Sequence, residues 1–263
     1  MALKKPVGAI TRGTTNPNRL RRVDRYITSL TVLKDIDQPL AVDLGYGKTP
    51  VTAVELLSRL KKNTPAIRVL GIEIDPARVS EAKALEHSML AFAHGGFEIP
   101  IPPEFSNRKD VDLIRALNVL RQYSESEVQT AWEKMQSRLS HSGLIIEGTS
   151  DEIGRVASFV TINKHEPVSF TISLRLQGLE RPSKVAERLP KVLIHKNTPG
   201  TNIHRYLSEL DQQWDKAAGF AAFGSAQRFI QMAKAMVQNG WPIENRPKRW
   251  RLGELSIDYK AIS

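Results

Sequence analysis

The sequence predicts an α/β protein with a mostly parallel, twisted sheet. Short apolar runs of strand length alternate with amphipathic segments of helix length through the first 150 residues. Such alternation is typical of right-handed β-α-β crossovers, which make neighbouring strands parallel. Glycine, proline and serine separate the runs, as expected at the turns. The expected strands are residues 39–44, 67–74, 89–93, 111–117 and 144–147.

Helix-start signals support this alternation. Thr49-Pro50 and Asp75-Pro76 each place an N-cap residue before a proline that suits the first helical turn. Serines open a further helix at residue 124. Apolar residues at i, i+3 and i+4 spacing also predict an amphipathic helix over residues 20–34.

The pattern changes after residue 150. Residues 156–162 and 168–176 form two strand-like runs with little between them, which indicates an antiparallel hairpin. A helical stretch follows, and residues 250–259 are strand-like again. We therefore expect a sheet with an antiparallel late strand and a helical insertion at about residues 180–248.

Charge is concentrated at the N-terminus. The chain has 263 residues and a net charge of +10, and its first thirty residues hold seven basic side chains against one acidic side chain. We therefore divide the chain into a basic arm with the first helix, residues 1–30, and one domain, residues 31–263. A basic arm can neutralise phosphates, so nucleic acid is a candidate partner. A solvated basic face is the ordinary alternative.

Composition excludes several classes of protein. The chain has no cysteine, which rules out disulfides, thiolate metal sites and a cysteine nucleophile. The histidines show no metal-ligand spacing, so we expect no metal site. No stretch approaches the roughly 18 apolar residues of a membrane span, and the start lacks the pattern of a signal peptide. We expect a soluble, cytoplasmic protein with no membrane partner.

The first candidate site is a glycine loop. Asp43 ends an apolar strand and is followed by Leu44-Gly45-Tyr46-Gly47 and a helix. Glycine permits a sharp turn and a close approach to a ligand, and the next helix presents free N–H groups. In open α/β sheets, ligands bind at this carboxyl edge of the strands. The loop therefore predicts a cofactor site.

An acidic residue at the end of the next strand extends this site. Glu73 follows Gly47 by one strand-helix-strand unit, and a carboxylate there can accept hydrogen bonds from both ribose hydroxyls. Asp75 lies on the same side of the strand and competes for this role. We favour Glu73, because Asp75 precedes Pro76 and suits a helix cap.

The loop also discriminates between adenosine cofactors. Pyrophosphate-binding loops carry a third glycine, and this chain has Pro50 at that position. The carboxylate of Asp43 would suit an ammonium group and would repel a diphosphate. Both features favour a cofactor with an amino-acid moiety over a dinucleotide.

These motifs resemble those of the class I S-adenosylmethionine-dependent methyltransferases. Residues 42–47 are similar to the first motif of that family and residues 71–75 to the second. The likeness covers roughly residues 38–150 and implies a Rossmann-like fold and S-adenosyl-L-methionine as cofactor. It further implies a methionine site beside the glycine loop and a ribose site at Glu73. Two later stretches, 118–123 and 249–254, resemble an actinobacterial-type set of these methyltransferases, which implies no particular acceptor.

The same resemblance suggests further cofactor contacts. Ile74 follows the ribose-binding acid, and residues 95–98 fall where the family contacts adenine. Many members have an acid in the register of Gly96, so here we expect contact through Phe97 and the backbone. Asn118 lies where the family places substrate-facing residues. It is the candidate catalytic residue, orienting a nucleophile or contacting the amino acid of the cofactor, unless it only caps its strand. The predicted cofactor-binding set is Asp43, Gly45, Tyr46, Gly47, Glu73, Ile74, Gly96, Phe97 and Asn118.

Two charged residues in predicted strands need an explanation. Arg115 lies in an apolar run, and a buried arginine requires a carboxylate or a ligand. We expect Glu147 or Asp112 to pair with it. Glu147 ends the fifth strand at the ligand-facing edge, where it would line a substrate pocket or cap the next segment.

The sequence thus predicts a methyltransferase whose methyl acceptor it does not specify. Two other classes fit some of the same features. One is a nicotinamide-dependent oxidoreductase with an unusual glycine loop, against which Pro50 argues. The other is a non-catalytic nucleic-acid-binding protein that keeps a vestigial cofactor fold, which the basic arm motivates.

Overall fold

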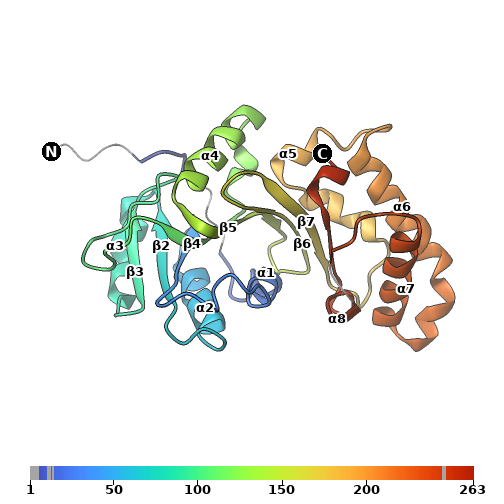
Figure 1. The fold of residues 1–263 in the computed structure, drawn as a ribbon, viewed down its shortest axis with the longest axis horizontal. Coiled ribbons are helices and arrows are strands. Elements are labelled where there is room, and N and C mark those ends of the chain that lie inside the picture. The colour runs from blue at the N-terminus through green and yellow to red at the C-terminus, as the bar shows by residue number, and fades with distance from the viewer. Residues whose placement is uncertain (1–5, 11–12, 14, 245–246) are drawn as a thin grey trace.

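The computed structural model describes residues 6–10, 13, 15–244 and 247–263. Its eight strands form a sheet in the order β3-β2-β1-β4-β5-β6-β7-β8 (Figure 1). The strands are β1 (Leu40–Leu44), β2 (Arg68–Glu73), β3 (Leu90–His94), β4 (Val111–Leu117), β5 (Leu139–Ser150), β6 (Val156–Ile162), β7 (Pro167–Leu174) and β8 (Glu254–Asp258).

The two parts of the sheet differ in strand direction. The pairs that join β3, β2, β1, β4 and β5 are parallel. The pairs from β5 through β6 and β7 to β8 are antiparallel. The predicted α/β class with antiparallel late strands is therefore confirmed. Because β1 has β2 on one side and β4 on the other, the chain changes direction across the sheet at the carboxyl end of β1, where ligands bind in such folds.

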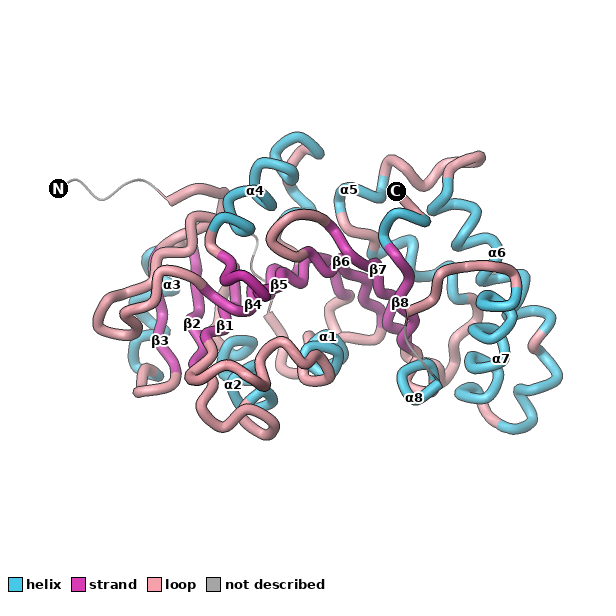
Figure 2. Tube along the Cα trace, in the orientation of Figure 1, coloured by secondary structure: helices cyan, strands magenta, loops and turns pink. Residues whose placement is uncertain are grey.

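Helices cover both faces of the sheet. One face packs against α1 (Arg21–Ile27), α2 (Val51–Leu60) and α3 (Pro76–Ala82). The other face packs against α4 (Glu125–Ser137) and α5 (Lys191–Ile194), and its core continues into α6 (Asn202–Lys216) and α7 (Ser225–Gln238). With α8 (Pro247–Trp250), the last three helices lie between β7 and β8 in the chain and cluster beside this end of the sheet (Figure 2). This is the predicted helical insertion.

Two predicted helix boundaries are wrong. The first helix ends at Ile27 instead of continuing to residue 34. The hydroxyls of Thr28 and Ser29 donate to the carbonyls of Arg25 and Tyr26, and such local bonds compete with helix propagation. The second helix begins after Pro50 with no side-chain cap from Thr49, whereas Asp75 caps α3 as predicted.

Among the residues that the structure describes, no helix is long and apolar enough to cross a membrane. The same residues contain no cluster of three or more histidine, aspartate or glutamate side chains arranged to hold a metal ion.

Candidate functional site

The glycine loop after β1 is fixed by close packing. Gly45 and Gly47 have φ angles of 69° and 84°, in the left-handed region that favours glycine. A Cβ on Gly45 would lie 2.7 Å from the Val119 side chain, and one on Gly47 would lie 2.6 Å from the hydroxyl of Thr15. Both glycines are therefore required by their neighbours. Tyr46 contributes only backbone to the loop surface, because its ring is buried against Phe92.

Glu73 is buried directly beneath this loop. Its Oε2 accepts a hydrogen bond from the N–H of Gly47 at 2.9 Å. Its Oε1 accepts from the N–H groups of Ile74 at 3.0 Å and Asp75 at 3.3 Å. Nη1 of Arg78 also ion-pairs with Oε1 at 3.5 Å. A carboxylate has about four lone-pair directions, so beside three N–H donors and this ion pair about one at most is left for a ligand hydroxyl. The competing acid, Asp75, instead accepts from the N–H of Ala77 as the cap of α3.

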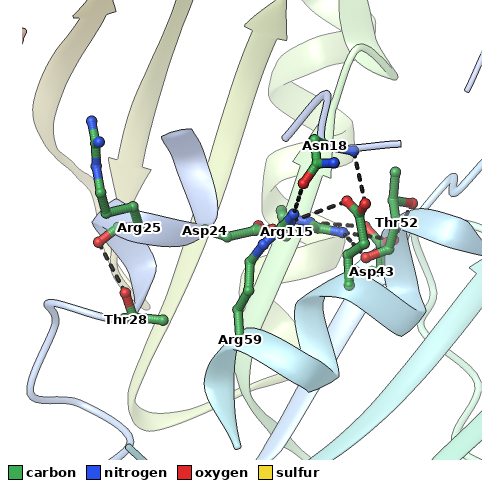
Figure 3. A network of polar contacts seen from close by, with 9 residues as sticks. Asn18, Asp24, Arg25, Thr28, Asp43, Thr52, Arg59 and Arg115 are labelled. Carbon is green, nitrogen blue, oxygen red and sulfur yellow. Dashed lines mark hydrogen bonds and ion pairs between the residues drawn. The ribbon is translucent and has the colours of Figure 1, made fainter. Parts of the chain in front are cut away.

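A buried ion network supports the other side of the loop. Arg115 on β4 is fully buried and ion-pairs with Asp24 of α1 and Asp43 of β1 (Figure 3). Burial alone would lower the pKa of Arg115, but attraction to the two carboxylates outweighs it and raises that pKa. Thr52 also donates to Asp43 at 2.6 Å. Since Asp43 is thus neutralised, we assign it to holding the loop and not to an ammonium group.

The predicted partners of Arg115 were wrong. Asp112 ion-pairs with Arg108, and Glu147 is not among the groups that contact Arg115. The register explains the difference, because parallel pairing of β1 with β4 places Asp43 opposite Arg115. Asp24 was not predicted, because the apolar spacing that predicts its helix does not identify ion-pair partners.

One end of the groove above the loop is closed by the N-terminal arm. The carbonyl of Val7 accepts from the N–H of Phe97 at 3.0 Å, and the N–H of Val7 donates to Glu98 Oε2 at 3.0 Å. The N–H of Ala9 donates to the hydroxyl of Tyr123 at 2.5 Å. We call this region, bounded by Ile74, Gly96, Phe97, Glu98 and Tyr123, the closed end.

The closed end is shaped around the arm. About 20 Å³ of free volume is left between the arm and the ends of β1 and β2 with residues 95–97. A separate cavity of about 380 Å³ lies on the side of the arm that faces α4. A Cβ on Gly96 would lie 2.0 Å from the carbonyl oxygen of Val7, so only glycine allows this approach. Ile99 has a φ of 49°, which is costly for a β-branched residue, and this turn aims Glu98 back toward the arm.

The other end of the groove is open. A cavity of about 480 Å³ lies between the arm, the glycine loop and the segment after β4, and its arm residues are Gly13, Thr15, Arg19 and Leu20. Asn118, at a φ of 64°, borders this cavity. Its side chain exchanges hydrogen bonds with Ser150, accepting from the N–H at 2.9 Å and donating to the hydroxyl at 3.2 Å. Asn118 therefore positions the ends of β4 and β5, and we call this cavity the open end.

Glu147 lies away from the groove. It does not border the open or the closed end, so the prediction that it faces the ligand edge is wrong. Side chains alternate along β5, and Glu147 points to the face covered by α4. Burial raises its pKa to about 8, with a smaller opposing effect of Trp132.

Among the basic side chains of the arm that the structure describes, Arg22 and Arg25 contact the rest of the domain, whereas Arg21 is exposed. Arg22 donates to the carbonyls of Gly154 and Leu252, and Arg25 donates to Leu252 as well. Lys4, Lys5 and Arg12 lie outside the described residues.

The sequence predicted residues 95–98 to lie at the adenine site but did not single out Glu98, and it gave no role to Tyr123 or to the arm segment 7–9. Glu98 follows Gly96 by only two residues, but the backward turn at Ile99 has no sequence signal. The arm segment has no periodicity, and it reaches the groove across more than 85 residues of chain.

No family model and no curated protein matches the chain. Solved structures do match. CalO1, a methyltransferase in calicheamicin biosynthesis with S-adenosylhomocysteine bound, is 11% identical, with 48% of this chain and 35% of that chain covered and a TM-score of 0.33. Human N-acetylserotonin methyltransferase in complex with S-adenosylmethionine is 22% identical, with 49% and 34% covered and a TM-score of 0.35. The 8-amino-8-demethyl-D-riboflavin dimethyltransferase from Streptomyces davawensis is 13% identical, with 49% and 36% covered and a TM-score of 0.36.

About half of the chain is similar in structure to these methyltransferases. It spans only about a third of the length of these three proteins. Because the TM-scores are below 0.5, the proposal below depends on the residues of this chain.

Proposed function

We propose that the protein binds S-adenosyl-L-methionine in this groove and transfers its methyl group to an acceptor. The observation that supports this most directly is the pair of contacts to Val7. The backbone N–H of Phe97 donates to Val7, and the carboxylate of Glu98 accepts from Val7, so a donor and an acceptor lie side by side. Adenine presents the matching pair, an amino donor next to a ring-nitrogen acceptor. The arm backbone thus occupies the place that an adenine edge would take.

The remaining parts of the groove fit the rest of the cofactor. Glu73 lies next to the closed end with about one lone pair free for a ribose hydroxyl. The glycine loop and the open end have room for the amino-acid moiety, with Gly45, Tyr46 and Gly47 offering backbone. Gly96 leaves space for a flat ring against Phe97 and Ile74.

The chemistry is expected to depend on positioning. The bound cofactor supplies an electrophilic methyl group, and the chain holds the acceptor in line with it. Asn118 is proposed to shape the acceptor side through Ser150 and not to act as a base, since both ends of its amide are engaged.

Cofactor binding requires the arm to leave the closed end. With about 20 Å³ free there, adenine and the segment 7–9 cannot both fit. The two should therefore compete. We expect the apparent affinity for the cofactor to fall as the fraction of chains with a docked arm rises, because only the undocked chains can bind.

A location in the cytoplasm is part of this proposal, in line with the absence of cysteine. Nucleic acid is not part of it, because Arg22 and Arg25 are engaged with carbonyls of the domain.

The test is calorimetric titration of the full chain with S-adenosylhomocysteine, with NAD as the rival ligand. We expect micromolar binding of the first ligand and none of NAD. Glu73→Ala should weaken binding about 30-fold or more, through loss of a ribose hydrogen bond to a charged group and of the carboxylate that holds the N–H of Gly47, and Glu73→Gln should weaken it less. Circular dichroism checks that both variants fold. Binding of NAD alone would instead favour an oxidoreductase.

A further inference from the structure

Three arginines from separate elements gather at the open end of the groove. Arg19 comes from the arm and Arg121 from the 3-10 turn η2 (Leu120–Gln122), and both border the 480 Å³ cavity. Arg188 comes from the 3-10 helix η3 (Pro182–Arg188), whose last carbonyl accepts from Thr149 at the end of β5. The fold thus brings three positive charges to the carboxyl edge of β4 and β5.

The protein leaves donors unused on two of these guanidinium groups, those of Arg121 and Arg188. Arg19 donates to the carbonyl oxygens of Ser150 and Asp151 at 3.2 and 3.1 Å. Within the described ranges, Arg121 makes no side-chain hydrogen bond or ion pair, and the buried Nε of Arg188 has no hydrogen-bond partner. Asp43, which also borders the cavity, is neutralised by Arg115.

The charge of Arg188 acts on both of the other arginines. Burial lowers the pKa of Arg19, and the charge of Arg188 lowers it further, while Glu152 and Asp151 oppose this. Burial and the charge of Arg188 likewise lower the pKa of Arg121. An anion placed among the three would relieve this repulsion and use the free donors of Arg121 and Arg188, because guanidinium groups bind carboxylate and phosphate with paired hydrogen bonds.

We propose that the methyl acceptor is a small molecule with an anionic group, a carboxylate or a phosphate, which Arg19, Arg121 and Arg188 bind at the open end. This rests on the proposed methyl transfer. The size of the cavity supports a small acceptor, since about 480 Å³ is typical of small-molecule sites. The position fits an acceptor as well, because the cavity begins at the glycine loop, beside the expected methyl group.

The experiment uses the full chain, with inorganic phosphate and benzoate as probes in calorimetric or thermal-shift titrations. The variants are Arg121→Gln and Arg188→Gln, and the control is Arg251→Gln, an exposed arginine outside the groove. Each cluster variant should weaken binding of one or both probes about tenfold, through loss of a charge-assisted bond. The control should not. The affinity for S-adenosylhomocysteine should stay within about twofold in every variant.

Three results would overturn the proposal. The first is that neither probe binds the parent protein at tens of millimolar. The second is that both probes bind the cluster variants as well as the parent. The third is that S-adenosylhomocysteine binding falls with the cluster variants, which would assign the arginines to the carboxylate of the cofactor. Failure of the proposed function looks different, because S-adenosylhomocysteine would then not bind the parent protein at all.

Discussion

The two ends of the groove differ in what they offer a ligand. The closed end binds through backbone N–H groups, one carboxylate and aromatic rings, and the arm already fills it. The open end has about 480 Å³ of space, bordered by Arg19 and by Arg121, whose side chain makes no hydrogen bond or ion pair within the described ranges. This contrast suggests a division of work. The closed end recognises a neutral edge that the chain can imitate with its own backbone, whereas the open end recognises a charge that the described chain does not provide.

The largest effect is expected from the buried ion network of Arg115, Asp24 and Asp43, which lies beneath the glycine loop between the two ends. Asp24→Ala removes one carboxylate from buried Arg115, whose guanidinium also holds Asp43 and the start of α2. Leaving a buried charge partly unpaired should lower the free energy of unfolding by roughly 3–5 kcal/mol. Urea denaturation measures this.

The matched control is Asp35→Ala, at an exposed aspartate. It should change stability by about 0.5 kcal/mol or less. If Asp24→Ala falls in the same range as this control, the network does not support the groove.

A second variant should displace the arm from the closed end and leave the open end unchanged. Gly96→Ala places a Cβ about where the carbonyl oxygen of Val7 lies, at 2.0 Å. The arm should then spend most of its time undocked, and thermolysin cleavage within residues 1–20 should speed up about tenfold.

Gly219→Ala is the control for this variant, because nothing lies within 4 Å of a Cβ there. Equal cleavage rates in Gly96→Ala and the parent protein would show that the closed end does not hold the arm.

Much of the groove could be predicted from the sequence, because its signals are local. The glycine loop, Glu73 and the cap at Asp75 each depend on a strand end or a helix start within a few residues. The closure of the groove could not be predicted, because it pairs segment 7–9 with residues near 97 and 123 through backbone groups that every residue has. The partner of Arg115 was also not predicted, because the two residues are far apart in the sequence. The one local signal is that Asp24 lies among the buried residues Val23 and Ile27 of α1, and an acid at a buried position indicates an ion pair.

A smaller effect is expected from the acid of the closed end. Glu98→Gln replaces one acceptor that faces N–H groups with a donor. It should weaken the binding of S-adenosylhomocysteine and of 5′-methylthioadenosine by the same factor, about five- to tenfold, because both ligands contain adenine. Phosphate binding at the open end should not change.

The control for this variant is Glu81→Gln, on the exposed face of α3. A selective loss of S-adenosylhomocysteine binding, with 5′-methylthioadenosine unaffected, would place Glu98 near the amino acid instead of the base.

No effect on either end is expected from Glu147→Gln. Its folded-state pKa is raised to about 8 by burial, above the roughly 4.3 of the unfolded chain. The folded state therefore holds one more proton between these pH values. The parent protein should lose up to about 1.4 kcal/mol of stability per pH unit across that window. Thermal unfolding from pH 5 to 8 should show a flatter profile in the variant, and a profile parallel to that of the parent would contradict the assignment.

The central claim is that arm and cofactor occupy the same place, and hydrogen–deuterium exchange of the full chain tests it most directly. Amide exchange is measured with and without saturating S-adenosylhomocysteine. We predict faster exchange in residues 6–10, where the N–H groups of Val7 and Ala9 lose their partners, and slower exchange in residues 71–75 and 95–98. The claim is contradicted if the ligand slows exchange in the groove while exchange in residues 6–10 stays the same or becomes slower. The arm would then cover the bound cofactor instead of competing with it.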